Sequence, residues 1–291
     1  MAAFNRLLRA AAPVASTLSP ARRVLSSVAS GATAGIPASL ARAGASVLVV
    51  RRDPAERNIQ WVFLGCPGVG KGTYASRLSQ LLGVPHIATG DLVREELSSS
   101  DPLARQLADI VNQGQLVPDE IIIELLSKRL EKGVAKGESG FILDGFPRTI
   151  RQAEILDGVT DIDLVVNLKL REEVLLEKCI GRRICSQCGK NFNVASIKMK
   201  GENGRPGISM APLLPPVQCA SKLISRADDT EEVVKERLRV YHELSQPVEG
   251  YYRSQGKLLE FDLPGGIPES WPKLLQALNL EDHDDKQSAA A

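Results

Sequence analysis

Short apolar runs alternate along the chain with stretches whose apolar positions recur every three or four residues. The apolar runs are WVFL (61–64), VPHIA (84–88), GFILDG (140–145), IDLVVNLKL (162–170) and KLLEFDL (257–263), and we expect them to form buried strands. The periodic stretches predict helices over residues 74–82, 91–99, 102–114, 118–133, 230–244 and 268–278. This alternation predicts a parallel sheet with helices on both faces, an α/β fold of three layers.

One region breaks the alternation. The segment between Arg183 and Arg226 is rich in Gly and Pro and has no helical pattern long enough to join the sheet. Inserted segments of this kind are commonly functional lids or disordered loops. The final stretch, EDHDDKQSAAA (281–291), predicts a flexible, solvated tail.

The first apolar run leads into a glycine-rich loop, in the stretch WVFLGCPGVGKGTY (61–74). Three glycines and a proline between Gly65 and Gly70 let the backbone turn tightly, so that its N–H groups can point at one anion. The N-terminus of the helix that follows also favours negative charge. With Lys71 placed to reach the outer phosphates, the pattern predicts a nucleotide phosphate site of the P-loop type.

The loop departs from the usual P-loop pattern at one position. Gly72 stands where the usual motif has the Ser or Thr that holds magnesium, and Thr73 comes one residue later. We therefore expect Mg²⁺ to rely on phosphates, waters and a carboxylate from elsewhere in the chain.

The stretch FILDGFPRTIRQ (141–152) supplies such a carboxylate. Asp144 ends an expected strand, at the sheet edge where α/β proteins bind ligands, and there it could hold Mg²⁺ through water. Gly145 then permits a close backbone approach, Pro147 fixes the turn, and Arg148 offers a bidentate fork for phosphate. The alternative is a buried aspartate that only ties down a turn.

Four further arginines, Arg94, Arg182, Arg226 and Arg237, are candidates for a phosphate clamp. Two of them flank the inserted segment, and Arg237 lies one helical stretch later. Phosphoryl transfer needs positioning and charge neutralisation more than acid–base groups, so a flap carrying arginines over a triphosphate suits that chemistry. The alternative for each arginine taken singly is a solvated surface residue.

The N-terminal segment has a composition of its own. Residues 1–52 contain seven arginines and no acid and are rich in Ala and Ser, which is typical of an organellar transit peptide. The alternative is a basic, disordered arm kept in the mature protein. A short amphipathic pattern around Phe4 and Leu8 leans mitochondrial, but the Ser/Ala-rich remainder suits a chloroplast equally well. We assign residues 1–55 to this leader and exclude them from the fold.

The chain as a whole has the composition of an ordinary soluble globular protein. Of the whole chain, 43% is hydrophobic and 24% charged, and no apolar run is long enough to cross a membrane. After position 52 there are 29 basic and 35 acidic residues, a net charge of −6. This acidic balance argues against nucleic acid as the main partner. Five scattered cysteines, an odd number without a secretory signal, do not indicate a disulfide framework.

Six motifs carry a family resemblance. GCPGVGKGT, TGDLVREE, GQLVPDE, LDGFPRTIRQ, GRR and SRADD occur in this order and span about residues 59–265. Together they resemble an adenylate kinase of the long-lid type, and with the leader the chain is similar to plant organellar members of that family. The resemblance implies a P-loop NTPase-type, three-layer core over residues 56–280. Inserted in it would be a helical AMP-binding segment at 89–118 and a lid at 182–227.

The resemblance also implies the reaction. Mg·ATP and AMP would give two ADP reversibly, in a monomer that serves adenine nucleotide homeostasis in the chloroplast stroma or the mitochondrial matrix. Other nucleoside monophosphate kinases share the loop and the DGFPR plan, so a GTP:AMP or a UMP/CMP kinase is the alternative. A third alternative, from another class, is a P-loop nucleotide sensor without turnover.

Site residues follow from matching this sequence to the family motifs. The resemblance implies a donor site for ATP formed by Gly68, Val69, Gly70, Lys71, Gly72, Thr73, Arg182, Asn191, Phe192 and Gly266. It implies an AMP site formed by Thr89, Arg94, Gln115, Leu116, Val117, Gly145, Phe146, Pro147, Arg148, Gln152, Arg226 and Arg237. The expected catalytic residues are Lys71, Asp144, Arg148, Arg182, Arg226 and Arg237. Gln152 is expected to read adenine, and Asp228 and Asp229 to hold the arginines in place.

Two departures from the family concern the lid and its border. Lys178 stands where many relatives carry an arginine that stacks on the donor base, which leaves the choice between ATP and GTP open. Cys185-x-x-Cys188 and Cys219 are a weak zinc candidate, because zinc-binding relatives use two Cys pairs and Pro216 replaces the fourth member here. We therefore expect Mg²⁺ as the cofactor and a lid without zinc.

Overall fold

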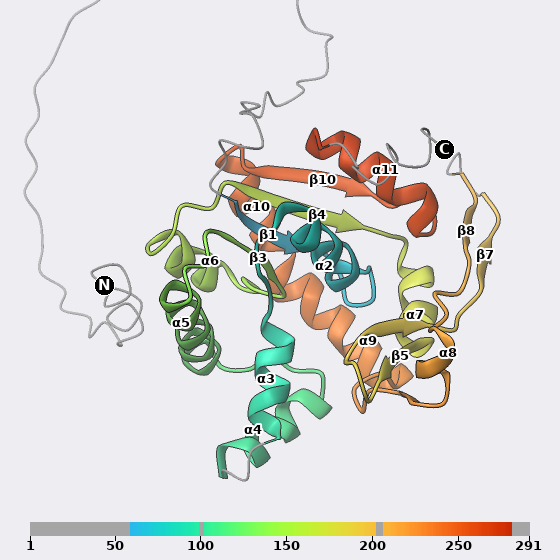
Figure 1. Ribbon diagram of the computed structural model, residues 1–291, viewed down its shortest axis with the longest axis horizontal. Coiled ribbons are helices and arrows are strands. Elements are labelled where there is room, and N and C mark those ends of the chain that lie inside the picture. The colour runs from blue at the N-terminus through green and yellow to red at the C-terminus, as the bar shows by residue number, and fades with distance from the viewer. Residues whose placement is uncertain (1–58, 99–101, 202–205, 281–291) are drawn as a thin grey trace, which may run out of the picture.

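The computed structural model describes residues 59–98, 102–201 and 206–280 (Figure 1). The expected leader and tail lie outside the described residues. The central sheet is parallel and has the strand order β10-β4-β1-β3-β2. Its strands are β1 (Gln60–Leu64), β2 (His86–Ala88), β3 (Phe141–Asp144), β4 (Leu164–Lys169) and β10 (Leu258–Asp262). The predicted parallel α/β sheet is confirmed.

Helices cover both faces of the sheet because its strands are apolar on both sides. In β1, Trp61 and Phe63 pack into one core, and Val62 and Leu64 pack into the other. The first core is closed by α2 (Lys71–Leu82), α7 (Glu172–Ile180), α9 (Glu231–Val240) and α11 (Ile267–Leu278). The second core is closed by α3 (Thr89–Leu97), α5 (Asp119–Ala135), α6 (Ile150–Asp157) and α10 (Pro247–Ser254). The result is the predicted three-layer arrangement.

One helix lies beside this sandwich, and another helical region differs from the predicted pattern. Helix α4 (Pro102–Asn112) packs with α3 and extends away from the sheet (Figure 1). The helix expected over 230–244 is α9 followed by a π-helical segment, Tyr241–Ser245, which leads into α10. Helices α6, α7 and α10 were not among the helices that the apolar periodicity predicted.

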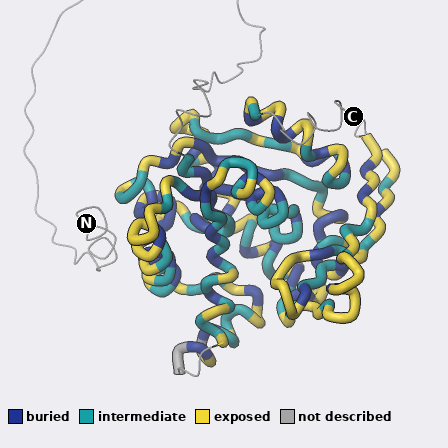
Figure 2. Tube along the Cα trace, in the orientation of Figure 1, coloured by how far each residue is buried: buried dark blue, intermediate teal, exposed yellow. Residues whose placement is uncertain are grey.

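The inserted segment forms small sheets of its own. Strands β5 (Arg182–Cys185), β6 (Asn191–Asn193) and β9 (Leu223–Ile224) make one antiparallel sheet, and β7 (Ile197–Met199) pairs with β8 (Ile208–Met210) in a second. A short helix, α8 (Val217–Ala220), lies between β8 and β9 in the sequence. Much of this region is exposed, whereas the central sheet is largely buried (Figure 2). The sequence pattern had predicted no strands here.

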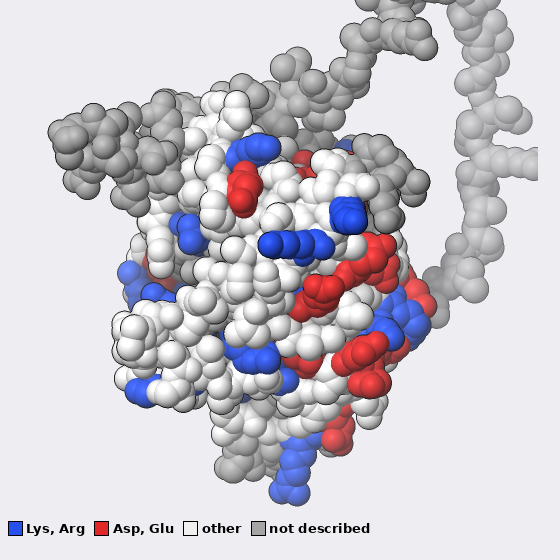
Figure 3. All heavy atoms as spheres, turned by 90° about the vertical axis from the view of Figure 1, so that its right-hand side faces the viewer, with Lys and Arg blue, Asp and Glu red and all other residues white. Residues whose placement is uncertain are grey.

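The surface on the side of the inserted segment carries mixed charge. Figure 3 shows acidic and basic side chains interspersed on that face rather than gathered in a patch of one sign. Among the described residues, none of the helices combines the length and the apolar character that crossing a membrane requires.

Candidate active site

The glycine-rich loop between β1 and α2 has the backbone conformation that its sequence predicts. Gly65, Gly68 and Gly70 have φ angles of +134°, +83° and +113°, in the left-handed region that disfavours side chains. The space at Gly68 is equally restrictive, because an added Cβ would lie 2.5 Å from the Cys179 sulfur and 2.9 Å from the Leu175 carbonyl oxygen. The loop is therefore folded tightly against α7.

Lys71 opens α2 and bends back over this loop. Its Nζ donates to the carbonyl oxygens of Gly65 (2.7 Å) and Cys66 (3.1 Å). Burial lowers the pKa of Lys71 to about 8, although the charge of Asp144 opposes the shift. An anion bound in the loop would remove this penalty, so the geometry suits a phosphate ligand.

Asp144 faces the loop from the end of β3. A Cβ on Gly72 would lie 3.1 Å from Asp144 Oδ2, so the missing Ser or Thr side chain leaves the room that the carboxylate uses. Burial alone would raise the pKa of Asp144, but the nearby His86 side chain and the charges of Lys71 and Arg148 outweigh it and lower the pKa. The group is thus an anionic oxygen donor beside a phosphate loop, which fits a hydrated Mg²⁺.

The proximity of His86 was not predicted. Its Nε2 lies 3.7 Å from Asp144 Oδ2, because β2 pairs with β3 and sets Ala88 opposite Asp144. No sequence pattern links positions 86 and 144, so nothing in the sequence signals this contact.

A cavity of about 670 Å³ gathers most of the predicted AMP residues. Those that line it are Thr89, Arg94, Gln115, Leu116, Val117, Gly145, Arg148, Gln152 and Arg237. Asp228, which was expected to hold the arginines, also lines it, as do residues that were not predicted: Gly90, Val93, Val111, Gly114 and Ile122. Val93, Val111 and Ile122 could have been found in the sequence, because they belong to the apolar faces of the amphipathic helices α3, α4 and α5.

Gln152 is held rigidly at this cavity. It is 2% exposed; its Oε1 accepts a hydrogen bond from the Arg148 backbone N–H (2.7 Å), and its Nε2 donates to Asp119 Oδ1 (2.6 Å). Thr149 caps α6 by accepting from the Gln152 backbone N–H at 3.1 Å. Asp119 was not predicted as a partner; in the sequence it stands out only as an acid in the first turn of α5.

A second cavity, of about 570 Å³, joins the first one to the glycine loop. The two share Gly114, Leu116, Gly145, Arg148 and Arg237. The second cavity is also lined by Lys71 and by Pro147, a predicted AMP residue. Two other predicted AMP residues line neither cavity: Phe146 is 1% exposed in the apolar core, and Arg226 lies at the lid.

Aspartates hold the arginines beside the inserted segment. Arg182 Nε donates to Asp229 Oδ2 at 2.8 Å, and its Nη2 bonds the other oxygen of that carboxylate. Arg237 Nη1 donates to Asp228 Oδ2 at 2.7 Å and lies 3.7 Å from Asp229. Burial would lower the pKa of Arg182, but Asp229 outweighs it and raises that pKa. The pairing expected for Asp228 and Asp229 agrees with this geometry.

Two arginines lie in positively charged surroundings. Burial, and then the charge of Arg237, lowers the pKa of Arg148 to about 10, while its Nε donates to the Gly145 carbonyl oxygen at 2.7 Å. Burial, and then Arg182, lowers the pKa of Arg226 to about 10. Arg226 Nη2 donates to Asn191 Oδ1 at 2.8 Å. Such a concentration of cations favours an anionic ligand.

The residues expected to bind ATP do not share one cavity as most of the expected AMP residues do. Gly68, Gly70 and Thr73 line neither cavity. The Phe192 side chain is 9% exposed and packs in the core of the inserted segment, so a contact with ATP would have to use its backbone. The Gly266 backbone N–H donates to the Ser209 carbonyl oxygen at 3.3 Å, which puts Gly266 beside the β7–β8 pair.

Lys178 contacts the glycine loop directly. Its Nζ donates to the Val69 carbonyl oxygen at 3.0 Å, and burial lowers its pKa to about 8. Its own carbonyl oxygen accepts from Asn193 Nδ2 at 2.8 Å, so this residue links the loop to β6. The expectation for Lys178 concerned the donor base, whereas here its ammonium group lies against the phosphate loop.

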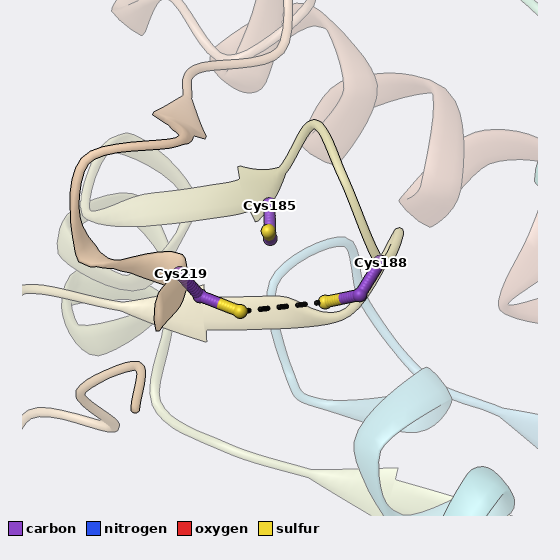
Figure 4. Close-up of side chains that lie close together, drawn as sticks. All are labelled: Cys185, Cys188 and Cys219. Atoms are coloured by element: carbon purple, nitrogen blue, oxygen red, sulfur yellow. Dashed lines mark hydrogen bonds between the residues drawn. The ribbon is translucent and has the colours of Figure 1, made fainter. Parts of the chain in front are cut away.

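Three cysteines of the inserted segment come together (Figure 4). The sulfur atoms of Cys185, Cys188 and Cys219 lie within 4.8 Å of one another, and those of Cys188 and Cys219 are 3.7 Å apart. Backbone N–H groups of the turn lower the pKa of Cys185 to about 7. Within the described residues no fourth Cys, His, Asp or Glu joins the group, so the closed four-ligand set of a structural zinc site is not present.

Comparison with known proteins gives the family. Residues 63–257 match the family model described as Adenylate kinase. The chain belongs to the adenylate kinase family. A relative from Arabidopsis thaliana named "Adenylate kinase 1, chloroplastic" is 78% identical over 241 residues, covering 83% of this chain and 85% of the relative. "Probable adenylate kinase 1, chloroplastic" from Oryza sativa subsp. japonica is 69% identical over 293 residues and covers 100% of both chains. "Probable adenylate kinase 7, mitochondrial" from the same rice is 39% identical, over 98% of this chain and 97% of the relative.

The activity follows from this membership. The protein is an adenylate kinase, a phosphotransferase that transfers a phosphoryl group to AMP. Its substrates are nucleotides, and its location is an organelle. These findings favour the adenylate kinase reading over the two alternatives, another monophosphate kinase or a non-catalytic sensor.

Proposed function

We propose that the two connected cavities are the path of the transferred phosphoryl group in ATP + AMP ⇌ 2 ADP. AMP occupies the larger cavity, with its base against Val93, Val111 and Ile122 and within reach of Gln152. Its phosphate points toward Arg148. The observation that carries this proposal is the continuity of the cavities, because Arg148 and Arg237 line both.

The donor nucleotide lies along the glycine loop. Backbone N–H groups from Gly68 to Thr73 receive its phosphates, and Lys71 exchanges its two carbonyl partners for the transferring group. Arg182, Arg226 and Asn191 approach from the lid, with the Phe192 and Gly266 backbones toward the base. The chain's residues need no general base, since the attacking oxygen of the AMP phosphate is already anionic.

Asp144 holds the magnesium ion that accompanies ATP. Its carboxylate faces the loop and its lowered pKa keeps it ionised, which suits an ion that retains several waters. An ion held there would supply positive charge that offsets the negative charge of the phosphates. His86 lies beside the same carboxylate, with its Nε2 3.7 Å from Asp144 Oδ2.

The segments at 89–118 and 182–227 close over the nucleotides. Closure excludes water, which would otherwise accept the phosphoryl group, and it brings the lid arginines to the charge that must be neutralised. We further propose that the protein is a monomer, that it works in the chloroplast stroma, and that its lid holds no zinc. Chloroplast names among the most similar relatives described above support the location.

The test is a coupled assay on the full chain with Mg²⁺, pairing ATP or GTP with AMP, CMP or UMP. We expect ADP formation with ATP and AMP, and at least tenfold less turnover with the other pairs. Lys71→Ala should abolish turnover, whereas Lys128→Ala, which removes an exposed lysine paired with Glu124, should not. Equal turnover with GTP would reassign the donor site, and nucleotide binding without ADP formation would refute the mechanism.

A further inference from the structure

The three lid thiols come from two separate parts of the lid. Cys185 ends β5 and Cys188 lies in the turn that leads to β6, whereas Cys219 lies in α8, 31 positions after Cys188. Figure 4 shows the sulfur atoms of Cys188 and Cys219 pointing at each other across the gap between these parts. No nucleotide role has been assigned to any of them.

Their arrangement favours sulfur–sulfur chemistry over a closed metal site. In the part of the chain that the structure describes, no fourth ligand joins the three thiols, and Pro216, at the expected fourth position, is the N-cap residue of α8. The sulfur atoms of Cys188 and Cys219, 3.7 Å apart, are in van der Waals contact, so a small shift of the turn or of α8 brings them to bonding distance. Cys188 is exposed, and Cys185 and Cys219 are buried. A dissolved reagent therefore reaches one thiol first and leaves a second beside it.

We propose that Cys188 and Cys219 form a reversible disulfide by exchange with a small disulfide such as glutathione disulfide. Cys188, as thiolate, attacks one sulfur of the reagent, and the first glutathione leaves with the proton that Cys188 gave up. Cys219 loses its proton to solvent, its sulfur attacks Cys188 in the mixed disulfide, and the second glutathione leaves and is protonated. Two protein thiols are oxidised and one glutathione disulfide is reduced to two thiols.

The bond would staple the lid without locking it to the rest of the protein. Both cysteines lie within 182–227, so the link joins the β5–β6 turn to α8 and leaves the two ends of the lid free to move. It closes a loop that contains β7 and β8, and such a loop loses conformational freedom in the unfolded state. The effect expected is a more stable lid with turnover changed by less than about twofold, because the clamp arginines are not displaced.

The experiment is a redox titration of the full chain. Protein reduced with dithiothreitol is equilibrated in glutathione buffers of increasing disulfide content, its free thiols are alkylated, and its peptides are mapped by mass spectrometry. We expect a peptide pair linked through Cys188 and Cys219, and a thermal midpoint several degrees above that of the reduced protein. Cys188→Ser and Cys219→Ser should each abolish the link and the shift, and Cys185→Ser should retain both.

Three results would overturn the proposal. They are a chain that keeps both thiols free in the most oxidising buffer, a link that joins Cys185 to Cys188 instead, and a metal that co-purifies on the three thiols and blocks oxidation. The peptide map of the unmodified chain does not depend on how the serine variants fold.

Discussion

Asp229 should decide the stability of the arginine clamp. Its side chain is 1% exposed and receives a two-bond contact from Arg182, while Arg237 lies 3.7 Å away. Asp229→Asn keeps the shape of the side chain and removes its charge. Two partly buried guanidinium groups, 17% and 18% exposed, would then face each other with only Asp228 to compensate them.

The size of the effect follows from this burial. Breaking a buried ion pair by removing one partner costs about 3–5 kcal/mol, and the asparagine keeps one acceptor oxygen, so we expect about 3 kcal/mol. For a domain of this size that corresponds to a thermal midpoint lower by about 6–12 °C. Turnover should fall as well, because Arg182 loses the carboxylate that orients it and Arg237 loses a neighbouring negative charge.

The assay is urea unfolding of the nucleotide-free protein, followed by steady-state kinetics. Glu243→Gln is the matched control: it removes one charge from an exposed pair with Arg239, 56% and 52% exposed, and should cost less than about 1 kcal/mol. ATP and AMP together should restore part of the stability of Asp229→Asn, because their phosphates supply negative charge. A loss no larger than that of the control would show that the arginines do not depend on this carboxylate.

Three further predictions concern the nucleotide sites. Because the pKa of Lys71 is lowered to about 8, its positive charge is present below pH 8 and lost above it, so kcat/KM for ATP should fall as pH rises through 8. A flat profile to pH 9.5 would contradict this. Lys178 also has a pKa of about 8, so the profile is repeated with Lys178→Arg, which excludes a contribution from that lysine. Gly68→Ala should lower kcat/KM for ATP more than about tenfold with little change in KM for AMP, because the new methyl group would clash with the backbone of α7. Equal changes for both nucleotides would indicate general misfolding. Gln152→Leu should raise KM for AMP up to about tenfold, because it removes the proposed hydrogen bond between the Gln152 amide and adenine. Initial rates at varied AMP measure it, and an unchanged KM would remove Gln152 from the AMP site.

The features that were predicted correctly depend on residues close together in the sequence. The β1 strand, the glycine loop and the start of α2 form one continuous stretch, and its positive φ angles occur at glycines. The strand that ends at Asp144 is likewise defined by its own apolar run. Local patterns of this kind determine local backbone structure, and the parallel sheet follows from their alternation.

The features that were missed depend on distant contacts or on short elements. Gln152 and Asp119 are 33 positions apart, and no periodicity indicates that their side chains meet. The lid strands have two to four residues and are stabilised by pairing with one another, so a strand pattern was too short to recognise. Phe192 fills the small lid core with Cys185 and Cys219, a role that only the folded lid reveals.

The hydrogen-bond partners of the lysine and arginine side chains in the site bear on how fast the enzyme can release product and bind new substrate. Lys71 and Arg148 are held by backbone carbonyl oxygens, and Arg182 and Arg237 by carboxylates. Each cation therefore already has a partner when ADP departs, and it need not wait for water to solvate it. In the proposed mechanism, substrate arrival and product departure therefore exchange one acceptor for another, and no cation is left without a partner in either direction. A reversible kinase, whose products in one direction are its substrates in the other, benefits from this symmetry.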